Sequence, residues 1–388
     1  MMTLKERVMS CMEASVANHE CAGLSLLVCA DGQEALYAET GYADIAANKP
    51  IRRDSIFRLY SQSKPVTAAA VMLLVERGVI DLFDPVEKYL PGFRKQRVWT
   101  PEGLVDVNRP VYVHDLLGMV SGLSYPEGDG AGQYAARLFE EEHALIREGQ
   151  GRGTVELANR IGELPLAFQP GDQYRYGTSA DVLGAVVEVA SGKSFAAFLK
   201  EELFDPLGMK DTAFWVPEEK RDRFVTCYKR VPGGLEVYEG LHLAVGDYTR
   251  EPAFASGGAG LVSTLDDYAA FASMLLNEGL YKGQRVMSPA TVRYMTQSQL
   301  TEHASRTNWV NLVGYGYGRL MRVGLHPGQA GMIASMGEYG WDGWLGSYFA
   351  NFPGERVTFL AMQNTTDTGT APVTRKLRNI VLADLSCR

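Results

Sequence analysis

The chain has 388 residues and a formal net charge of −8 at pH 7. An acidic chain repels phosphate backbones and anionic lipid headgroups, so this charge argues against non-specific binding to nucleic acid or to an anionic membrane. At about 150 residues per domain, the length predicts two domains, or one large domain with an insertion.

The N-terminal segment, residues 1–16, is predicted to form an amphipathic helix rather than a secretion signal. Thr3 and Glu6 match a capping box, and Glu6 and Glu13 interrupt any apolar run. The sequence also contains no stretch of 18 uncharged apolar residues. We therefore expect a cytoplasmic protein with no membrane partner, and a homodimer is one expectation for its assembly.

The cysteines and histidines do not have the spacing of a disulfide framework or a zinc site. No C-x-x-C pair and no H-x-x-x-H pair occurs in the sequence. We expect neither a metal nor an organic cofactor. The five cysteines are Cys11, Cys21, Cys29, Cys227 and Cys387.

Both ends of the chain contain β-hairpin patterns. They lie at residues 23–42 and 347–362, with turns at Asp31-Gly32 and Pro353-Gly354. Strands joined by tight turns pair antiparallel. The sequence therefore predicts one antiparallel sheet built from both chain ends, with terminal helices, including residues 372–385, on its face.

The middle of the chain shows helical patterns instead. Residues 65–77 are apolar nearly all round and end at Gly78, which predicts a buried central helix. We predict a mostly helical domain at residues 60–250, inserted into a sheet domain of residues 1–59 and 251–388, with the active site at their interface. Further helical spacing occurs at residues 113–119, 133–147, 155–163, 181–191, 195–204 and 265–277.

Ser61 and Lys64 form the only Ser-x-x-Lys pattern in the chain. Ser61 is placed at the start of the central helix, where free N–H groups and the helix dipole favour negative charge. The Lys64 amine, three residues on, can reach the Ser61 hydroxyl, and burial lowers the pKa of a lysine towards that of a useful base. The alternative is that Ser61 only caps the helix while Lys64 extends to solvent. Position alone does not separate these interpretations.

Tyr176 follows a Pro170-Gly171 turn and precedes the helix at residues 181–191. A tyrosine beside a cationic lysine can act as general base and then as general acid. The alternative is a tyrosine that only packs in a loop.

The third pattern is Trp341-Asp342-Gly343-Trp344. A glycine inside a strand often marks a close approach of ligand or backbone, and two tryptophans can form the wall of an apolar pocket. The backbone N–H of Trp344, on an edge strand, could complete an oxyanion hole with that of Ser61. The alternative is an aromatic-rich core strand.

Together these three patterns resemble the serine β-lactamase and penicillin-binding-protein superfamily, at its class-C-like esterase branch (family VIII-type carboxylesterases). The resemblance implies an α/β (α+β) fold, in which an antiparallel sheet is flanked by helices and carries an inserted, mostly helical domain. It also implies that Ser61 is the nucleophile, activated by Lys64 and Tyr176. The similarity covers most of the chain, with landmarks in the same order at residues 55–93, 113–123, 168–194, 204–214 and 256–279.

The chain departs from the family pattern at two of these motifs. Thr178 stands where the family has an asparagine, and Trp341-Asp342-Gly343 replaces Lys-Thr-Gly or His-x-Gly. In lactamases and peptidases of the family, the cation of the third motif helps to hold the substrate carboxylate. Trp341 removes that attraction, and Asp342 adds repulsion, which favours ester hydrolysis over β-lactam chemistry.

The sequence therefore predicts a serine carboxylesterase that cleaves small-molecule esters, short-chain or aryl, through an acyl-enzyme on Ser61. One alternative is a β-lactam or D-amino-acid peptide hydrolase, or an acyltransferase, of the same superfamily. A second is a non-catalytic binding protein with the same fold. The residues expected to contact substrate are Tyr125, Thr178, Trp341, Asp342, Gly343 and Trp344.

Overall fold

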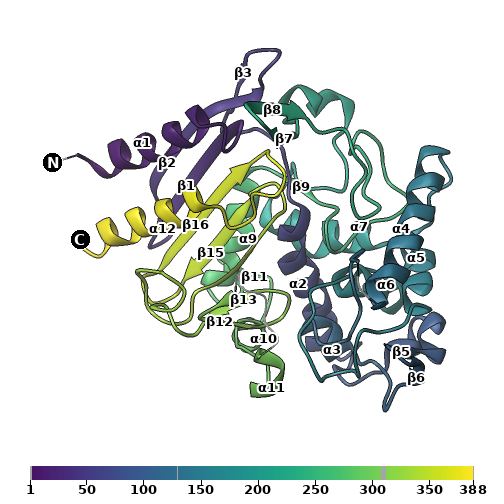
Figure 1. The fold of residues 1–388 in the computed structure, drawn as a ribbon. Helices are drawn as coiled ribbons and strands as arrows, with labels where there is room; N and C mark the ends of the chain where they lie inside the picture. Colours follow the sequence, from purple (N-terminus) through teal and green to yellow (C-terminus); the bar gives the residue numbers. More distant parts are fainter. Residues whose placement is uncertain (1, 129, 307–311, 388) are drawn as a thin grey trace.

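A computed structural model describes residues 2–128, 130–306 and 312–387. It contains an antiparallel sheet with helices on both faces and a largely helical region beside it (Figure 1). The α-helices are α1 Leu4–Ala17, α2 Lys64–Glu76, α3 Val113–Leu117, α4 Gly130–Arg147, α5 Thr154–Gly162, α6 Ser179–Ser191, α7 Phe195–Leu199, α8 Asp205–Leu207, α9 Leu265–Leu276, α10 Pro289–Met295, α11 Glu302–Ser305 and α12 Pro372–Leu385. Short helical turns of other types are η1 Tyr60–Ser63, η2 Val86–Lys88, η3 Pro91–Lys95, η4 Lys200–Phe204 and η5 Glu218–Arg223.

The main sheet has eight strands in the order β12-β13-β14-β15-β16-β1-β2-β3. Its strands are β1 Gly23–Ala30, β2 Gln33–Asp44, β3 Lys49–Pro50, β12 Tyr315–Tyr317, β13 Arg322–Gly324, β14 Tyr339–Asp342, β15 Tyr348–Phe352 and β16 Val357–Gln363. Two-stranded pairs are formed by β4 Phe57–Arg58 with β9 Val262–Ser263, β5 Arg97–Thr100 with β6 Gly103–Asp106, β7 Tyr228–Val231 with β8 Gly234–Val237, and β10 Leu280–Tyr281 with β11 Gln284–Arg285.

Strand β1 joins the two ends of the chain, because it pairs antiparallel with both β2 and β16. Leu27 is opposite Tyr37 on one side and Leu360 on the other. The predicted antiparallel sheet built from both chain ends is therefore confirmed.

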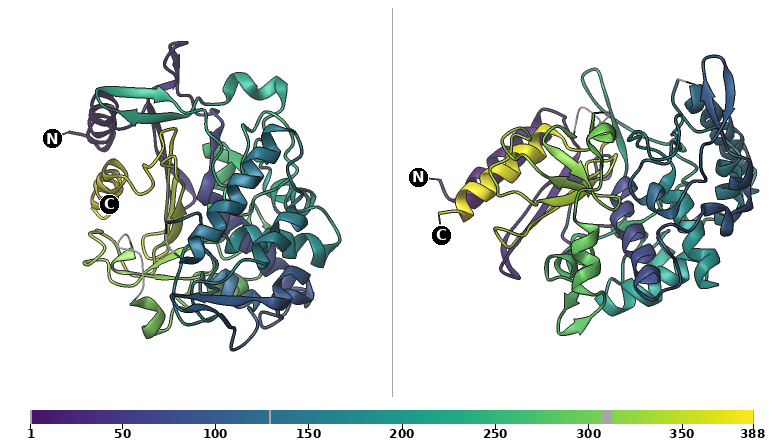
Figure 2. Two further views of the ribbon diagram at one scale, coloured as in Figure 1. Left: turned by 45° about the vertical axis from the view of Figure 1, so that its right-hand side comes forward. Right: turned by 90° about the horizontal axis from the view of Figure 1, so that it is seen from below.

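The two faces of this sheet are covered by different helices. Helices α1 and α12 lie side by side on one face, where Leu26 and Phe359 pack in one hydrophobic cluster (Figures 1 and 2). The neighbouring residues Leu27 and Leu360 point to the other face and share a cluster with α2 and α9. This alternation follows from the two-residue period of a strand.

Several predicted helices are confirmed with shifts of a few residues at their ends. In α1, Thr3 and Glu6 form both halves of the capping box. Helix α2 buries its first eleven residues, as expected for a helix without a polar face. The predicted helix at 195–204 is α7 followed by a π-helical turn, η4.

Helices α3 to α7 form the region to one side of the sheet (Figure 1). One hydrophobic cluster runs from this region into the sheet, so the domain boundaries at residues 60 and 250 stay a prediction. Within the predicted helical domain, the β7–β8 hairpin is tied to the chain after β16: the Tyr228 N–H donates to the Asn364 carbonyl at 2.8 Å.

Among the described residues, no single helix has the length and apolar character needed to cross a membrane, although one bent pair, Ser179–Ser191 with Phe195–Leu207, meets the criteria of length and composition.

Candidate active site

Ser61 lies in a tight corner between β4 and α2. The chain leaves β4, passes through the turn η1 and enters α2 at Lys64. Tyr60, just before Ser61, has a φ of 44°, in the left-handed region that costs a non-glycine residue about 1–2 kcal/mol. Tyr60 is held there by burial and by an edge-on contact with Trp344, whose ring centroid is 5.1 Å away. Strain of this kind is typical of functional sites.

The Lys64 amine is directed at the Ser61 hydroxyl. Its Nζ lies 3.0 Å from Ser61 Oγ and donates to the Gly258 carbonyl at 2.8 Å. The side chain is fully buried, and this burial lowers the pKa of Lys64 to about 7, although the negative charges of Asp181 and Asp342 act in the opposite direction. A large share of Lys64 side chains is therefore neutral at pH 7 and able to accept a proton.

Tyr176 completes the group around Ser61, and its ring centroid lies 4.6 Å from Lys64 Nζ. The next residue is a glycine for a steric reason: a Cβ on Gly177 would lie 2.2 Å from the Leu123 carbonyl oxygen. Burial raises the pKa of Tyr176 above its usual value, while hydrogen bonding to Ser61 and Trp341 partly opposes the rise. The Tyr176 hydroxyl is therefore protonated at pH 7, which suits it to pass on a proton rather than to take the first one.

Trp341 and Asp342 lie at the end of β14 that faces this group. β14 is an interior strand, but its ladder with β13 stops at Gly340, so Trp341 and Asp342 pair only with β15. The Trp341 indole is buried and donates from Nε1 to Tyr176 Oη at 3.0 Å. Asp342 accepts a hydrogen bond from Thr370 Oγ1 at 2.8 Å.

Gly343 and Trp344 follow the strand. A Cβ on Gly343 would lie 2.1 Å from the Leu59 carbonyl oxygen, so only glycine allows this approach to the chain leading to Ser61. The Trp344 ring stacks on His242, with centroids 4.1 Å apart, and its Nε1 donates to Asp367 at 2.7 Å. The two tryptophans therefore do not form one wall: Trp341 lies against Tyr176, and Trp344 joins a separate aromatic cluster.

Tyr125 and Thr178 are the remaining predicted substrate contacts. The Tyr125 ring is 5.5 Å from that of Tyr176, and Lys64 Nζ lies 5.6 Å from its centroid, so Tyr125 belongs to the same group. Thr178 is almost completely buried at the start of α6, and its hydroxyl has no hydrogen-bond partner among the described residues.

Two groups that contact or face Lys64 were not identified from the sequence. Asp181 is buried, accepts from Ser256 Oγ at 2.5 Å and from the Gly258 N–H at 3.0 Å, and its charge acts on Lys64. The Gly258 carbonyl accepts from Lys64 itself. Two features of the sequence could have pointed to them: a carboxylate within the apolar start of α6, and the Ser256-Gly257-Gly258 sequence.

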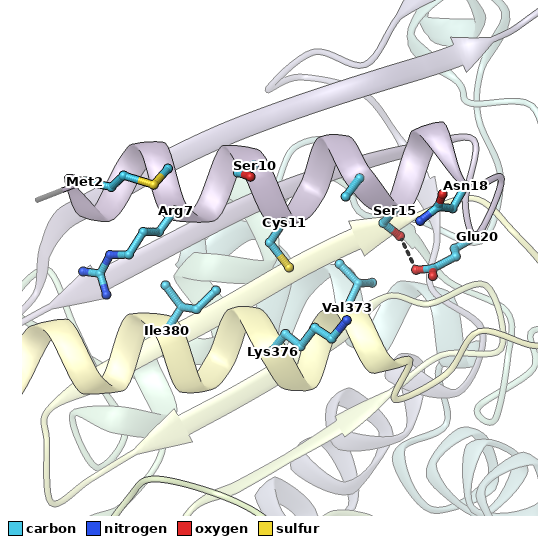
Figure 3. A pocket seen from close by; sticks show the side chains of 11 residues that line it. Met2, Arg7, Ser10, Cys11, Ser15, Asn18, Glu20, Val373, Lys376 and Ile380 are labelled. Atoms are coloured by element: carbon cyan, nitrogen blue, oxygen red, sulfur yellow. Dashed lines mark hydrogen bonds between the residues drawn. The ribbon is translucent and has the colours of Figure 1, made fainter.

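A cavity of about 420 Å³ lies elsewhere, between α1 and α12 (Figure 3). Arg7, Cys11, Glu20 and Lys376 are among the residues that line it. These helices cover the sheet face opposite α2, so this cavity is separate from the group around Ser61. A second cavity, of about 300 Å³, is bordered by Trp344.

Comparison with known proteins places this arrangement in a family. A family model described as Beta-lactamase matches residues 8–383. The chain belongs to the beta-lactamase family.

Relatives and a solved structure match this beta-lactamase family member over 80% or more of its length. Esterase EstB of Burkholderia gladioli is 32% identical over 397 residues, covering 98% of this chain and 96% of that protein. Protein Rv1367c of Mycobacterium tuberculosis (strain ATCC 25618 / H37Rv) is 34% identical over 320 residues, covering 80% and 77%. The structure of EstCE1, a hydrolase with promiscuous acyltransferase activity, matches with a TM-score of 0.82 at 25% identity, covering 98% of each chain. The predicted fold class and the predicted esterase branch are confirmed.

Proposed function

We propose that this protein is a serine hydrolase that cleaves carboxylic esters through an acyl-enzyme on Ser61. The observation that carries the proposal is the 3.0 Å contact between Lys64 Nζ and Ser61 Oγ, made by a buried lysine whose pKa is lowered to about 7. A serine hydroxyl becomes an effective nucleophile when a neutral base lies within hydrogen-bond distance of it.

In the acylation step, the neutral Lys64 amine accepts the Ser61 hydroxyl proton as Oγ attacks the ester carbonyl carbon. The resulting oxyanion accepts hydrogen bonds from the backbone N–H groups of Ser61 and Trp344. When the ester C–O bond breaks, Tyr176 donates its proton to the leaving alcohol and regains one from Lys64. The start of α2 adds the positive end of a helix dipole near the oxyanion.

In the deacylation step, water takes the place of the departed alcohol. The Tyr176 and Lys64 pair removes a proton from water, the hydroxyl attacks the acyl carbonyl, and the proton returns to Ser61 Oγ as the acid leaves. Both steps move protons only between Ser61, Lys64, Tyr176 and the alcohol or water, so the mechanism assigns no step to a metal or cofactor.

The relatives support an ester as substrate. Esterase EstB and EstCE1 are named for hydrolysis, and both match along almost the entire chain. Acyl transfer to an alcohol in place of water is the alternative within the same mechanism. It is supported by acyltransferase calJ of Penicillium decumbens, which is 29% identical over 282 residues, covering 69% of this chain and 63% of that protein.

We predict that Ser61→Ala abolishes ester hydrolysis without unfolding the protein. Removal of the nucleophile should lower kcat/KM for p-nitrophenyl butyrate by roughly 10⁴-fold or more. The wild-type protein, but not Ser61→Ala, should also be labelled by a fluorophosphonate. Ser10→Ala, at an exposed position of α1, is the control, and comparable turnover by Ser61→Ala would rule the mechanism out.

The ester preference is tested by assaying nitrocefin beside p-nitrophenyl butyrate. Trp341 supplies no cation to a substrate carboxylate, and Asp342 places a carboxyl group nearby, so the ester should be the better substrate. Preferential nitrocefin cleavage would favour the β-lactam alternative. The absence of both activities and of labelling would favour the non-catalytic binding protein.

The cytoplasmic location and the homodimer remain predictions from the sequence.

A further inference from the structure

The cavity beside Trp344 differs from the rest of the site in its charge. Its volume is about 300 Å³. Two of its lining residues are cations, whereas the third motif of this chain has none. The lining residues are Lys229, Arg230, Tyr238, Trp344, Thr366 and Asp367.

The two cations are placed at the cavity by the β7–β8 hairpin. Tyr228, which precedes them, donates its N–H to Asn364 and accepts from the Thr366 N–H, both at 2.8 Å, and so fixes the hairpin to the chain after β16. Lys229 Nζ forms an ion pair with Glu236 Oε2 at 3.3 Å. Arg230 makes no ion pair with any described residue. The hairpin therefore presents at least one guanidinium free to bind an anion.

The remaining polar groups of the cavity are one acid and one hydroxyl. The acid, Asp367, accepts the Trp344 Nε1–H at 2.7 Å, and the two lining cations outnumber its single formal negative charge. Thr366 is 3% exposed and lines the cavity, so its hydroxyl is a further polar group at this site. An arginine, a lysine and a hydroxyl are donor types that hold carboxylates and phosphates in proteins.

Two aromatic side chains, Trp344 and Tyr60, lie between the cavity and the nucleophile. Trp344 borders the cavity, its ring packs on Tyr60, and Tyr60 immediately precedes Ser61. An ester held at Ser61 with a substituent extending past Trp344 would bring that substituent to Arg230. This chain thus has no cation in the third motif, but it has cations at the cavity beyond Trp344, further from the scissile bond.

We propose that this cavity is a substrate subsite, which binds an anionic group carried by the ester at a distance from its scissile carbonyl. The inference rests on the proposed function and adds a substrate class to it: esters with a carboxylate on the acyl chain or on the alcohol. A guanidinium supplies two parallel N–H groups to such a carboxylate, and the Thr366 hydroxyl supplies a further donor.

Two matched substrate pairs separate the acyl side from the alcohol side. For the acyl side, mono-p-nitrophenyl adipate is compared with p-nitrophenyl hexanoate, which has a neutral acyl chain of the same length. For the alcohol side, 4-acetoxybenzoate is compared with its methyl ester. The double variant Lys229→Gln/Arg230→Gln is assayed on all four. The control, Lys282→Gln/Arg306→Gln, removes two exposed cations, one in the turn between β10 and β11 and one just after α11.

The Lys229→Gln/Arg230→Gln variant should lose five- to tenfold in kcat/KM on the charged member of one pair and less than twofold on both neutral esters. The loss should arise in KM and shrink at 0.5 M NaCl, because surface charges are screened by salt. No selective loss on either charged ester, or an equal loss on the neutral ones, would overturn the subsite. Ser61→Ala keeps the two proposals apart: Ser61-dependent turnover of the neutral esters upholds the mechanism even where the subsite fails.

Discussion

Lys64 combines two properties that normally exclude each other, full burial and an ionisable amine. Burial is what lowers the pKa of its amine to about 7, because no described carboxylate forms an ion pair with it and the charges of Asp181 and Asp342 only partly oppose the shift. The neutral amine is the active form. We therefore predict that kcat/KM for p-nitrophenyl butyrate rises with pH through about 7 and levels off above it. A profile that is flat from pH 5 to 9 would contradict the role of Lys64.

Asp181 provides a way to move that pH profile without touching the reacting atoms. Its negative charge raises the pKa of Lys64, so Asp181→Asn should shift the rising limb of kcat/KM to lower pH. The asparagine oxygen can still accept from Ser256 and Gly258, which keeps the loop in place. An unshifted limb with a lower plateau would mean that Asp181 is only structural. Asp266→Asn, which removes an exposed carboxylate of α9, is the matched control.

Trp341 contacts Tyr176 instead of lining an open pocket, because its indole is buried and donates a hydrogen bond to the tyrosine oxygen. Trp341→Phe keeps a ring against Tyr317 but removes that hydrogen bond, which favours the ionised tyrosine. We predict about a tenfold fall in kcat with little change in KM, in line with about 1.4 kcal/mol for one hydrogen bond of this kind. Trp99→Phe, in β5, should leave both constants unchanged. A change confined to KM would assign Trp341 to substrate binding instead.

At the scale of elements, the site depends on how closely the end of β14 approaches η1. A Cβ on Gly343 would lie 2.1 Å from Leu59 O, which is backbone and cannot turn aside. Gly343→Ala should therefore separate the proposed oxyanion donors and lower kcat/KM by roughly 100-fold or more, the usual loss for one oxyanion-hole donor. The control is Gly328→Ala, where an added Cβ meets nothing within 4 Å. Full activity in Gly343→Ala would place the oxyanion hole elsewhere.

The elements that sequence patterns predicted well are those with a strong local signal. The apolar surface of α2, the Thr3–Glu6 capping box and the hairpin turn at Asp31-Gly32 all depend on neighbouring residues. The short strands β12 and β13 have three residues each, too few for an alternating pattern to be visible.

The parts of the site that sequence patterns missed depend on contacts between distant segments. Gly258 contacts Lys64, and Asp181 in turn contacts Gly258, only because α6 and the loop before β9 pack beside α2. The sequence also did not predict which way the Trp344 side chain points. β14 ends at Asp342, so the alternation of side chains along a strand does not extend to Trp344.

At the scale of the whole molecule, the catalytic lysine lowers the stability of the fold. Lowering the pKa of Lys64 from 10.5 to about 7 costs about 4 kcal/mol at pH 7, while the hydrogen bond to Gly258 returns about 1–3 kcal/mol. We predict that Lys64→Met abolishes activity and yet raises the free energy of unfolding at pH 7 by about 2 kcal/mol. Urea unfolding at several pH values measures this difference.

The sign of the pH dependence gives a second check on the same variant. Between pH 7 and 10.5 the unfolded wild-type chain binds a proton at Lys64 that the folded chain has lost, so wild-type stability rises with pH there. The advantage of Lys64→Met should be constant below pH 7 and disappear towards pH 10.5. Lys5→Met, at an exposed position of α1, should show no such trend. A less stable Lys64→Met at neutral pH would mean that the lysine is not strained by burial.

The pairing of β1 with β16 also sets the order of events while the chain is being made. β1 leaves the ribosome early and finds β2 at once, but its other edge waits for Val357–Gln363. At roughly 5–20 residues per second, that wait is on the order of tens of seconds. Throughout it, a strand of apolar residues presents unpaired N–H and C=O groups to other chains. The sheet that brings the two chain ends together therefore makes the nascent protein dependent on protection of that edge until its last strand arrives.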